Sequence, residues 1–131
     1  MTDNKSAVNS SEIVNQKLTL PLIELSELVS ITGDDQAQLK GLLSRFYTDY
    51  LQKGQEIQQA LQENQLMTAQ RHVHNIAGSA QMIGAKTLRL ASQALDYSLR
   101  EGHLDPALSE HFLLVLEQTL ISLNQHIIAI P

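Results

Sequence analysis

The sequence predicts an all-helical protein, and three observations lead to that expectation. From Leu18 onward, apolar residues recur at spacings of three and four, which is the period of an amphipathic helix. Residues that cap or stop helices separate these periodic segments. No segment keeps a period of two, since Pro21 interrupts the short alternation over 18–20. Because short links join the long helices, we expect an up-down-up-down antiparallel four-helix bundle with a short additional N-terminal helix.

The first two predicted helices lie on either side of Gly33. A short helix precedes it and ends at Thr32-Gly33, with its apolar face formed by Leu22, Leu25, Leu28 and Val29. Asp34 or Asp35 caps the second helix. Gly54 lies inside this helix and costs about 1 kcal/mol relative to alanine, which allows a bend there. The apolar stripe of the second helix consists of Leu39, Leu42, Leu43, Phe46, Tyr50, Ile57 and Leu61.

Three further helices follow in the second half of the chain. The third is predicted over 65–83 and the fourth over 86–101, with Gly102 suited to a left-handed C-cap. The last is the most clearly signalled, because Asp105 is a good N-cap and Pro106 suits the first helical turn. The sequence thus supplies four long helices, one for each position of the bundle.

Length and composition predict one domain over 18–131, preceded by a flexible tail over 1–17 that is rich in Ser, Asn, Asp and Lys. The starting methionine and polar tail fit a free-standing protein, and a fragment of a longer hybrid kinase is the alternative. The net charge of −5 argues against a general nucleic-acid or anionic-membrane binder. Without cysteine there is no thiol nucleophile, and no continuous apolar run forms a signal peptide or membrane span. We therefore expect a cytoplasmic protein.

Acidic residues are unevenly distributed along the chain. None lies over 64–95, where Arg71, Lys86 and Arg89 give a local formal charge of +3. Such a segment suits contact with an anion or an acidic partner. The alternative is that a short, mostly buried helix pair has little room for charge.

One face of the third predicted helix combines a histidine with a glycine one turn later. Placed on a helical wheel, His74 lies away from the apolar stripe, on an outer face with Met67, Gln70, Arg71, Gly78 and Gln81. A glycine in mid-helix is destabilising, so Gly78 needs a reason. Either it leaves room for a partner that approaches His74, or it allows close packing of a neighbouring helix. Met67, Gln70 and Gln81 are correspondingly either a docking surface or ordinary boundary positions.

Two other chemistries are disfavoured by spacing. His72 and His74 are two residues apart on one helix and point away from each other, so they cannot chelate one metal ion. We expect no metal site. Ser79 lacks the strand-to-helix nucleophile elbow of a hydrolase triad.

These residues form a motif that resembles the signature of histidine-containing phosphotransfer (HPt) domains. In that family, His-x-Leu-Lys-Gly-Ser-Ala is followed by Gly-Ala and a leucine. The likeness extends over roughly 20–125, including Asp96, where the family often has Glu. The matching run here is His74-Asn75-Ile76-Ala77-Gly78-Ser79-Ala80, then Gly84-Ala85 and Leu88.

The resemblance implies that His74 carries a phosphoryl group in a multistep His-Asp phosphorelay. The imidazole would exchange that group with the aspartates of receiver domains in response regulators or hybrid sensor kinases. Such a carrier is not an enzyme and needs no cofactor of its own, because the receiver is expected to bring Mg²⁺. Gly78 would leave room for the receiver.

One residue departs from the family pattern. The family's lysine, three residues after the histidine, is Ala77 here. Arg71, one turn before His74, or Lys86, at the start of the next helix, is the predicted source of compensating charge. Arg89 and Arg100 are expected to be solvated, and contact with a receiver is the alternative for them. The alternative function, which Ala77 favours, is a non-phosphorylated helical adaptor that binds a receiver or kinase domain.

Overall fold

The computed structural model describes residues 22–131, which form five α-helices and one short 3₁₀ helix. There is no strand within this range, so the all-helical class predicted from the sequence is confirmed. The predicted tail over 1–17 and the start of the predicted domain at 18–21 lie outside the described residues. The elements are α2 (Ser26–Thr32), α3 (Gln36–Gln62), α4 (Leu66–Ala80), η1 (Gln81–Ile83), α5 (Lys86–Arg100) and α6 (Pro106–Ala129).

The helix boundaries follow the capping residues of the sequence. The Asp35 side chain accepts a hydrogen bond from the backbone N–H of Gln38 at 2.9 Å and thereby caps α3. Asp105 does the same for α6, through the backbone N–H of Ala107 at 3.0 Å. Gly33 ends α2 at φ 59°, a backbone conformation that glycine adopts without steric cost. Local chemistry therefore fixes where these helices begin and end.

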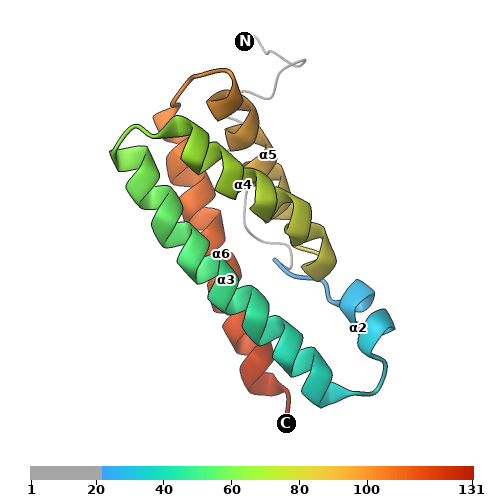
Figure 1. Ribbon diagram of the computed structural model, residues 1–131. Coiled ribbons are helices and arrows are strands. Elements are labelled where there is room, and N and C mark those ends of the chain that lie inside the picture. The colour runs from blue at the N-terminus through green and yellow to red at the C-terminus, as the bar shows by residue number, and fades with distance from the viewer. Residues whose placement is uncertain (1–21) are drawn as a thin grey trace.

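The four long helices lie side by side around one apolar core (Figure 1). The most extensive pairing is between α4 and α5, and α3 packs against both α4 and α6. Since α5 also packs against α6, each long helix borders two others. All four contribute fully buried side chains, which include Leu43, Tyr50, Ile57, Val73, Ile76, Leu88, Leu95, Phe112, Val115 and Leu123.

Gly54 allows α3 and α6 to approach each other closely. A Cβ at this position would lie 2.9 Å from Cδ2 of Leu116, which is itself buried. The helix continues through Gly54 as part of Gln36–Gln62. Gly54 therefore lowers the helix propensity of α3, but its lack of a side chain leaves room for Leu116 of α6.

The segment before α2 is tied to the turn between α4 and α5. The backbone N–H of Glu24 donates to the carbonyl of Ile83 at 3.0 Å. Gly84 follows with a left-handed φ of 60°, and a Cβ there would collide with the backbone carbonyl of Glu24. Only glycine fits both the backbone conformation and the close approach.

Among residues 22–131, α6 is the one helix long and apolar enough to cross a membrane by length and composition. It packs along α3 and α5, and Phe112, Val115 and Leu123 are buried in the bundle core. Core helices of soluble proteins pass the same test, so a single such helix is weak evidence for a membrane span.

Candidate functional site

His74 projects from the outer face of α4. Its neighbours Val73, Ile76 and Ala77 are buried against the rest of the bundle, so the helical period turns His74 outward. The imidazole is 60% exposed. The sequence-based placement of His74 away from the core is confirmed.

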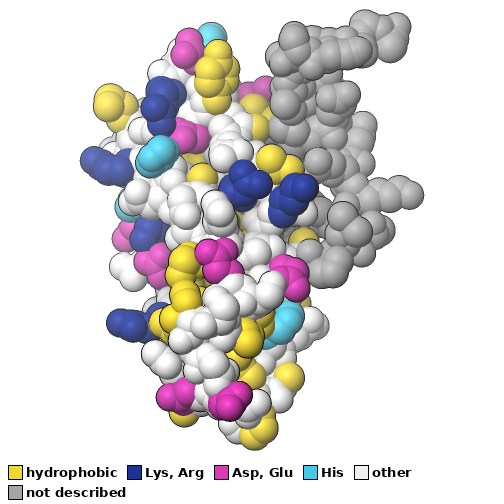
Figure 2. All heavy atoms as spheres, turned by 90° about the vertical axis from the view of Figure 1, so that its right-hand side faces the viewer, with side chains coloured by type: hydrophobic (Ala, Val, Ile, Leu, Met, Phe, Trp, Pro, Cys, Tyr) yellow, Lys and Arg dark blue, Asp and Glu magenta, His cyan; other side chains and the backbone are white. Residues whose placement is uncertain are grey.

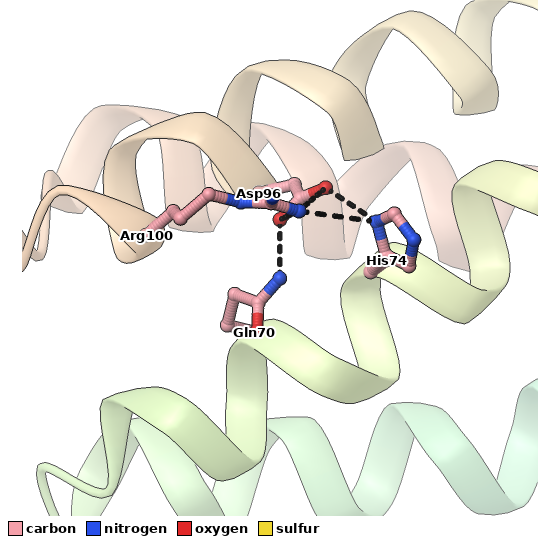
Figure 3. Close-up of polar contacts among 4 residues, drawn as sticks. All are labelled: Gln70, His74, Asp96 and Arg100. Atoms are coloured by element: carbon pink, nitrogen blue, oxygen red, sulfur yellow. Dashed lines mark hydrogen bonds and ion pairs between the residues drawn. The ribbon is translucent and has the colours of Figure 1, made fainter.

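A carboxylate from the neighbouring helix holds one edge of the imidazole. Nδ1 of His74 lies 2.8 Å from Oδ2 of Asp96, which projects from α5 (Figure 3). The Asp96 side chain is only 12% exposed. Because a carboxylate accepts hydrogen bonds, this contact favours the tautomer in which Nδ1 carries the proton and donates it to Asp96. In the neutral ring the lone pair then lies on Nε2.

Two further donors share the Asp96 carboxylate. Nε2 of Gln70 donates to Oδ1 at 2.7 Å, and Nη2 of Arg100 lies 3.2 Å from both oxygens. Figure 3 shows these side chains converging on Asp96 from two helices. Burial raises the pKa of Asp96, but the hydrogen bonds from Gln70, His74 and Arg100 outweigh it, and the net shift is downward. The carboxylate therefore stays ionised beside the imidazole.

Arg100 also approaches the imidazole directly. Its Nη2 lies 3.3 Å from Nδ1 of His74. A guanidinium only donates, and an Nδ1 that donates to Asp96 has no lone pair to accept, so this approach is a close contact beside the ring. The Arg100 side chain is 56% exposed, as expected for a solvated residue, and it also pairs with Asp96 at the edge of the ring.

The surface beside His74 is open at Gly78. A Cβ built on Gly78 meets nothing within 4 Å, so the alternative that this glycine serves helix packing is wrong for the described residues. The same substitution at Gly54 or Gly84 would bring a close contact. Gly78 instead leaves the helix backbone bare one turn after His74.

The inner side of α4 is anchored to α3 at the same level. The hydroxyls of Tyr50 and Ser79 lie 2.7 Å apart. Oγ of Ser79 donates to the carbonyl of Ile76, so the Tyr50 hydroxyl is the donor to Ser79. Burial raises the pKa of Tyr50 to about 12. This partly buried hydrogen bond joins α3 to the part of α4 that presents His74.

The other predicted site residues are distributed along the same side of α4 and beyond it. Gln70 is brought to His74 through Asp96, and Met67 is 81% exposed two turns before His74. Arg71 and Gln81 are exposed on α4 and η1. Lys86, also exposed, begins α5 ten residues before Asp96, about 15 Å along the helix axis. Within the described part of the chain, neither Arg71 nor Lys86 makes a hydrogen bond or ion pair with His74.

The sequence does not predict the pairing of Asp96 with His74 or the contact of Arg100 with both residues. A signal was present, because Asp96 and Arg100 are spaced i,i+4 on a helix and such residues face each other. Asp96 is also a charged residue next to the buried Leu95. The i,i+4 spacing does not reveal the register between α4 and α5, which places His74 beside Asp96 and Arg100.

The described residues contain no group of three or more side chains suited to a metal ion. His72 points to a different helix, where its Nε2 lies 3.3 Å from Oε1 of Glu56 on α3. It therefore does not join His74. The site consists of one exposed imidazole whose Nδ1 is held by Asp96, which leaves Nε2 as the second ring nitrogen.

The class that fold and site define is a helical bundle that presents an exposed histidine, paired with a carboxylate, on its surface. The profile of the Hpt domain family matches residues 41–126, and the chain belongs to this family. Hpt domains are phosphocarrier modules of His-Asp phosphorelays that interact with receiver domains, and they are typically soluble. No curated protein and no solved structure matched the chain.

Proposed function

We propose that this protein is a phosphocarrier in which His74 accepts a phosphoryl group from one receiver domain and passes it to another. The observation that carries the proposal is the hydrogen bond between Nδ1 of His74 and Asp96, which leaves Nε2 as the nitrogen with the lone pair on an imidazole that is 60% exposed. The surrounding bundle, an HPt up-down-up-down arrangement in this proposal, supplies a rigid support. A cytoplasmic location would suit exchange with receiver domains.

The transfer needs only one new bond on this chain. The Nε2 lone pair of His74 attacks the phosphorus of an aspartyl phosphate, and the nitrogen–phosphorus bond forms as the phosphorus–oxygen bond breaks. The leaving electron pair returns to the receiver's aspartate as a carboxylate. The Nδ1 proton stays on the ring, where Asp96 stabilises the positive charge that the imidazole gains. Transfer onward is the same step in reverse, and any Mg²⁺ belongs to the receiver.

The surface around His74 suits a partner of opposite charge. Acidic residues are absent over 64–95, and Figure 2 shows several basic side chains over the middle and upper part of one face of the bundle, with acidic side chains among them. The resemblance described above implies that the receiver brings an aspartate, which exchanges the phosphoryl group, and Mg²⁺. Met67 and the bare backbone at Gly78 would add apolar contact and room.

A second candidate function is a helical adaptor that binds a receiver or kinase domain without carrying phosphate. Ala77 favours it, because the ammonium that the family places near the phosphoryl group is missing. The intact contact between His74 and Asp96 favours the carrier, since an adaptor has no need of an oriented Nε2.

The test is incubation with a panel of phosphorylated receiver domains, following acid-labile, base-stable label on the small protein. The wild type and a His103→Gln control, altered at an exposed histidine outside the site, should both accept label. His74→Gln should not. Circular dichroism checks that each variant is helical. A folded wild type that accepts no label from any receiver would overturn the carrier and favour the adaptor.

A further inference from the structure

The charge balance at His74 changes when a phosphoryl group is added. Before transfer, the Asp96 carboxylate is balanced by the Arg100 guanidinium, and both groups lie beside Nδ1 of His74. A phosphoryl group brings roughly two negative charges at neutral pH. A phosphoryl group on Nε2 of His74 would place these negative charges on the same imidazole ring whose Nδ1 faces the negative Asp96 carboxylate. The phosphorylated site therefore needs a cation.

Arg100 is the cation that the structure places there. Among the described residues, its Nη2 is the cationic nitrogen in contact with both Asp96 and the imidazole of His74. The side chain is 56% exposed, so it can turn along the ring without displacing core residues. Within residues 22–131, Arg71 and Lys86, which the sequence suggested, make no such contact.

From this geometry we infer that Arg100 is the phosphoryl-binding residue of this carrier: its guanidinium leaves the Asp96 carboxylate, in whole or in part, and donates hydrogen bonds to the phosphoryl oxygens on Nε2 of His74. A guanidinium suits this exchange because its donors form a planar fork that matches phosphate oxygens. The inference rests on the proposed function, and it answers how a chain with Ala77 neutralises the phosphoryl group.

The position of Arg100 also explains why the cation can come from α5. It lies in the last turn of that helix, one turn after Asp96, so the same i,i+4 spacing that pairs the two side chains keeps the guanidinium beside the ring. Asp96 thus stores the cation before transfer and orients the imidazole at the same time. We class Asp96 as a positioning residue and Arg100 as one that touches the transferred group.

The experiment uses phosphoramidate as a chemical donor, so that no receiver is required, with ³¹P NMR to follow the phosphohistidine of His74. Assignment comes from the loss of its signal in His74→Gln. In Arg100→Gln, the second pKa of the phosphoryl group should rise by about one unit, a tenfold change in its ionisation constant. Arg100→Lys should retain part of the effect. Salt should reduce the difference between wild type and Arg100→Gln, since the site is partly exposed.

Arg89→Gln is the matched control. Arg89 lies eleven residues before Arg100, three turns earlier on the same face of α5, and the phosphoramidate reaction involves no partner. Its phosphoryl pKa should equal that of the wild type. Equal values in wild type and Arg100→Gln, or an equal shift in Arg89→Gln, would overturn the inference. With a receiver present, the share of label on the small protein should fall about tenfold in Arg100→Gln. Failure of the proposed function would look different, because even the wild type would then accept no label from receivers.

Discussion

Replacement of Gly78 by alanine should stabilise the fold and impair transfer at the same time. The added Cβ meets nothing within 4 Å, so no packing penalty opposes the gain in helix propensity of about 1 kcal/mol. For the 110 described residues, the usual entropy of unfolding is about 0.2 kcal/mol/K, so this gain raises Tm by about 4 °C. Thermal melting by circular dichroism measures the shift.

The same methyl group would occupy the space beside His74 that a receiver needs. An extra methyl group in a packed contact costs about 1–3 kcal/mol, so the second-order rate constant for phosphoryl acceptance should fall about tenfold. Rapid-quench transfer from a phosphorylated receiver measures this rate. Acceptance from phosphoramidate, a small donor, should remain within about twofold of the wild type, because the small donor does not need the docking surface.

Gly54→Ala is the matched substitution in another helix interior. Its Cβ would lie 2.9 Å from Cδ2 of the buried Leu116, so the propensity gain is offset and the rise in Tm should be smaller than for Gly78→Ala. A lower Tm for Gly78→Ala would refute the reasoning about open space. An unchanged rate of transfer from receivers would refute the docking role of Gly78.

Three further predictions concern buried polar groups. Tyr50→Phe removes the donor to Ser79 and should lower the free energy of unfolding by about 1 kcal/mol in urea titrations. Burial lowers the pKa of His111, so the unfolded chain takes up a proton at this residue before the folded protein does as pH falls below about 6.5. The free energy of unfolding should therefore decline from about pH 7.5 to about 5.5. In His111→Leu this decline should be less steep. Because the pKa of Asp96 is lower in the folded protein, this residue contributes stability above its unfolded pKa, and the contribution is lost as pH falls through its folded pKa. Acid unfolding of Asp96→Asn should therefore show a weaker pH dependence below about pH 4.

The sequence predicted the helices well because their limits are local. A segment of four residues, which begins with Asp105 and Pro106, specifies the start of α6. Gly33 ends α2 through its own backbone conformation. Periodicity likewise separated the buried face of α4 from the face that carries His74. These features depend on neighbours in the chain, which a sequence displays directly.

The environment of His74 was less predictable because it depends on the register of two helices. Periodicity placed His74 outside, but only the packing of α4 on α5 sets Asp96 at 2.8 Å from its ring. The same packing brings Arg100 to the site. The sequence instead suggested Arg71 and Lys86, which are closer to His74 in the chain. The open space at Gly78 was also not predictable from the sequence, since a glycine inside a helix is consistent with a close contact as well as with open space.

The contact between Glu24 and Ile83 bears on the order in which the protein assembles. It joins residues 59 positions apart, so its formation closes a long loop, whereas α4 and α5 are consecutive helices with a short link. Contacts of low sequence separation form with less loss of chain entropy. We therefore expect the α4–α5 hairpin to form before α2 docks, and local opening of α2 to leave His74 and Asp96 paired. In native-state hydrogen exchange, the amides of α2 should exchange well before those around the histidine.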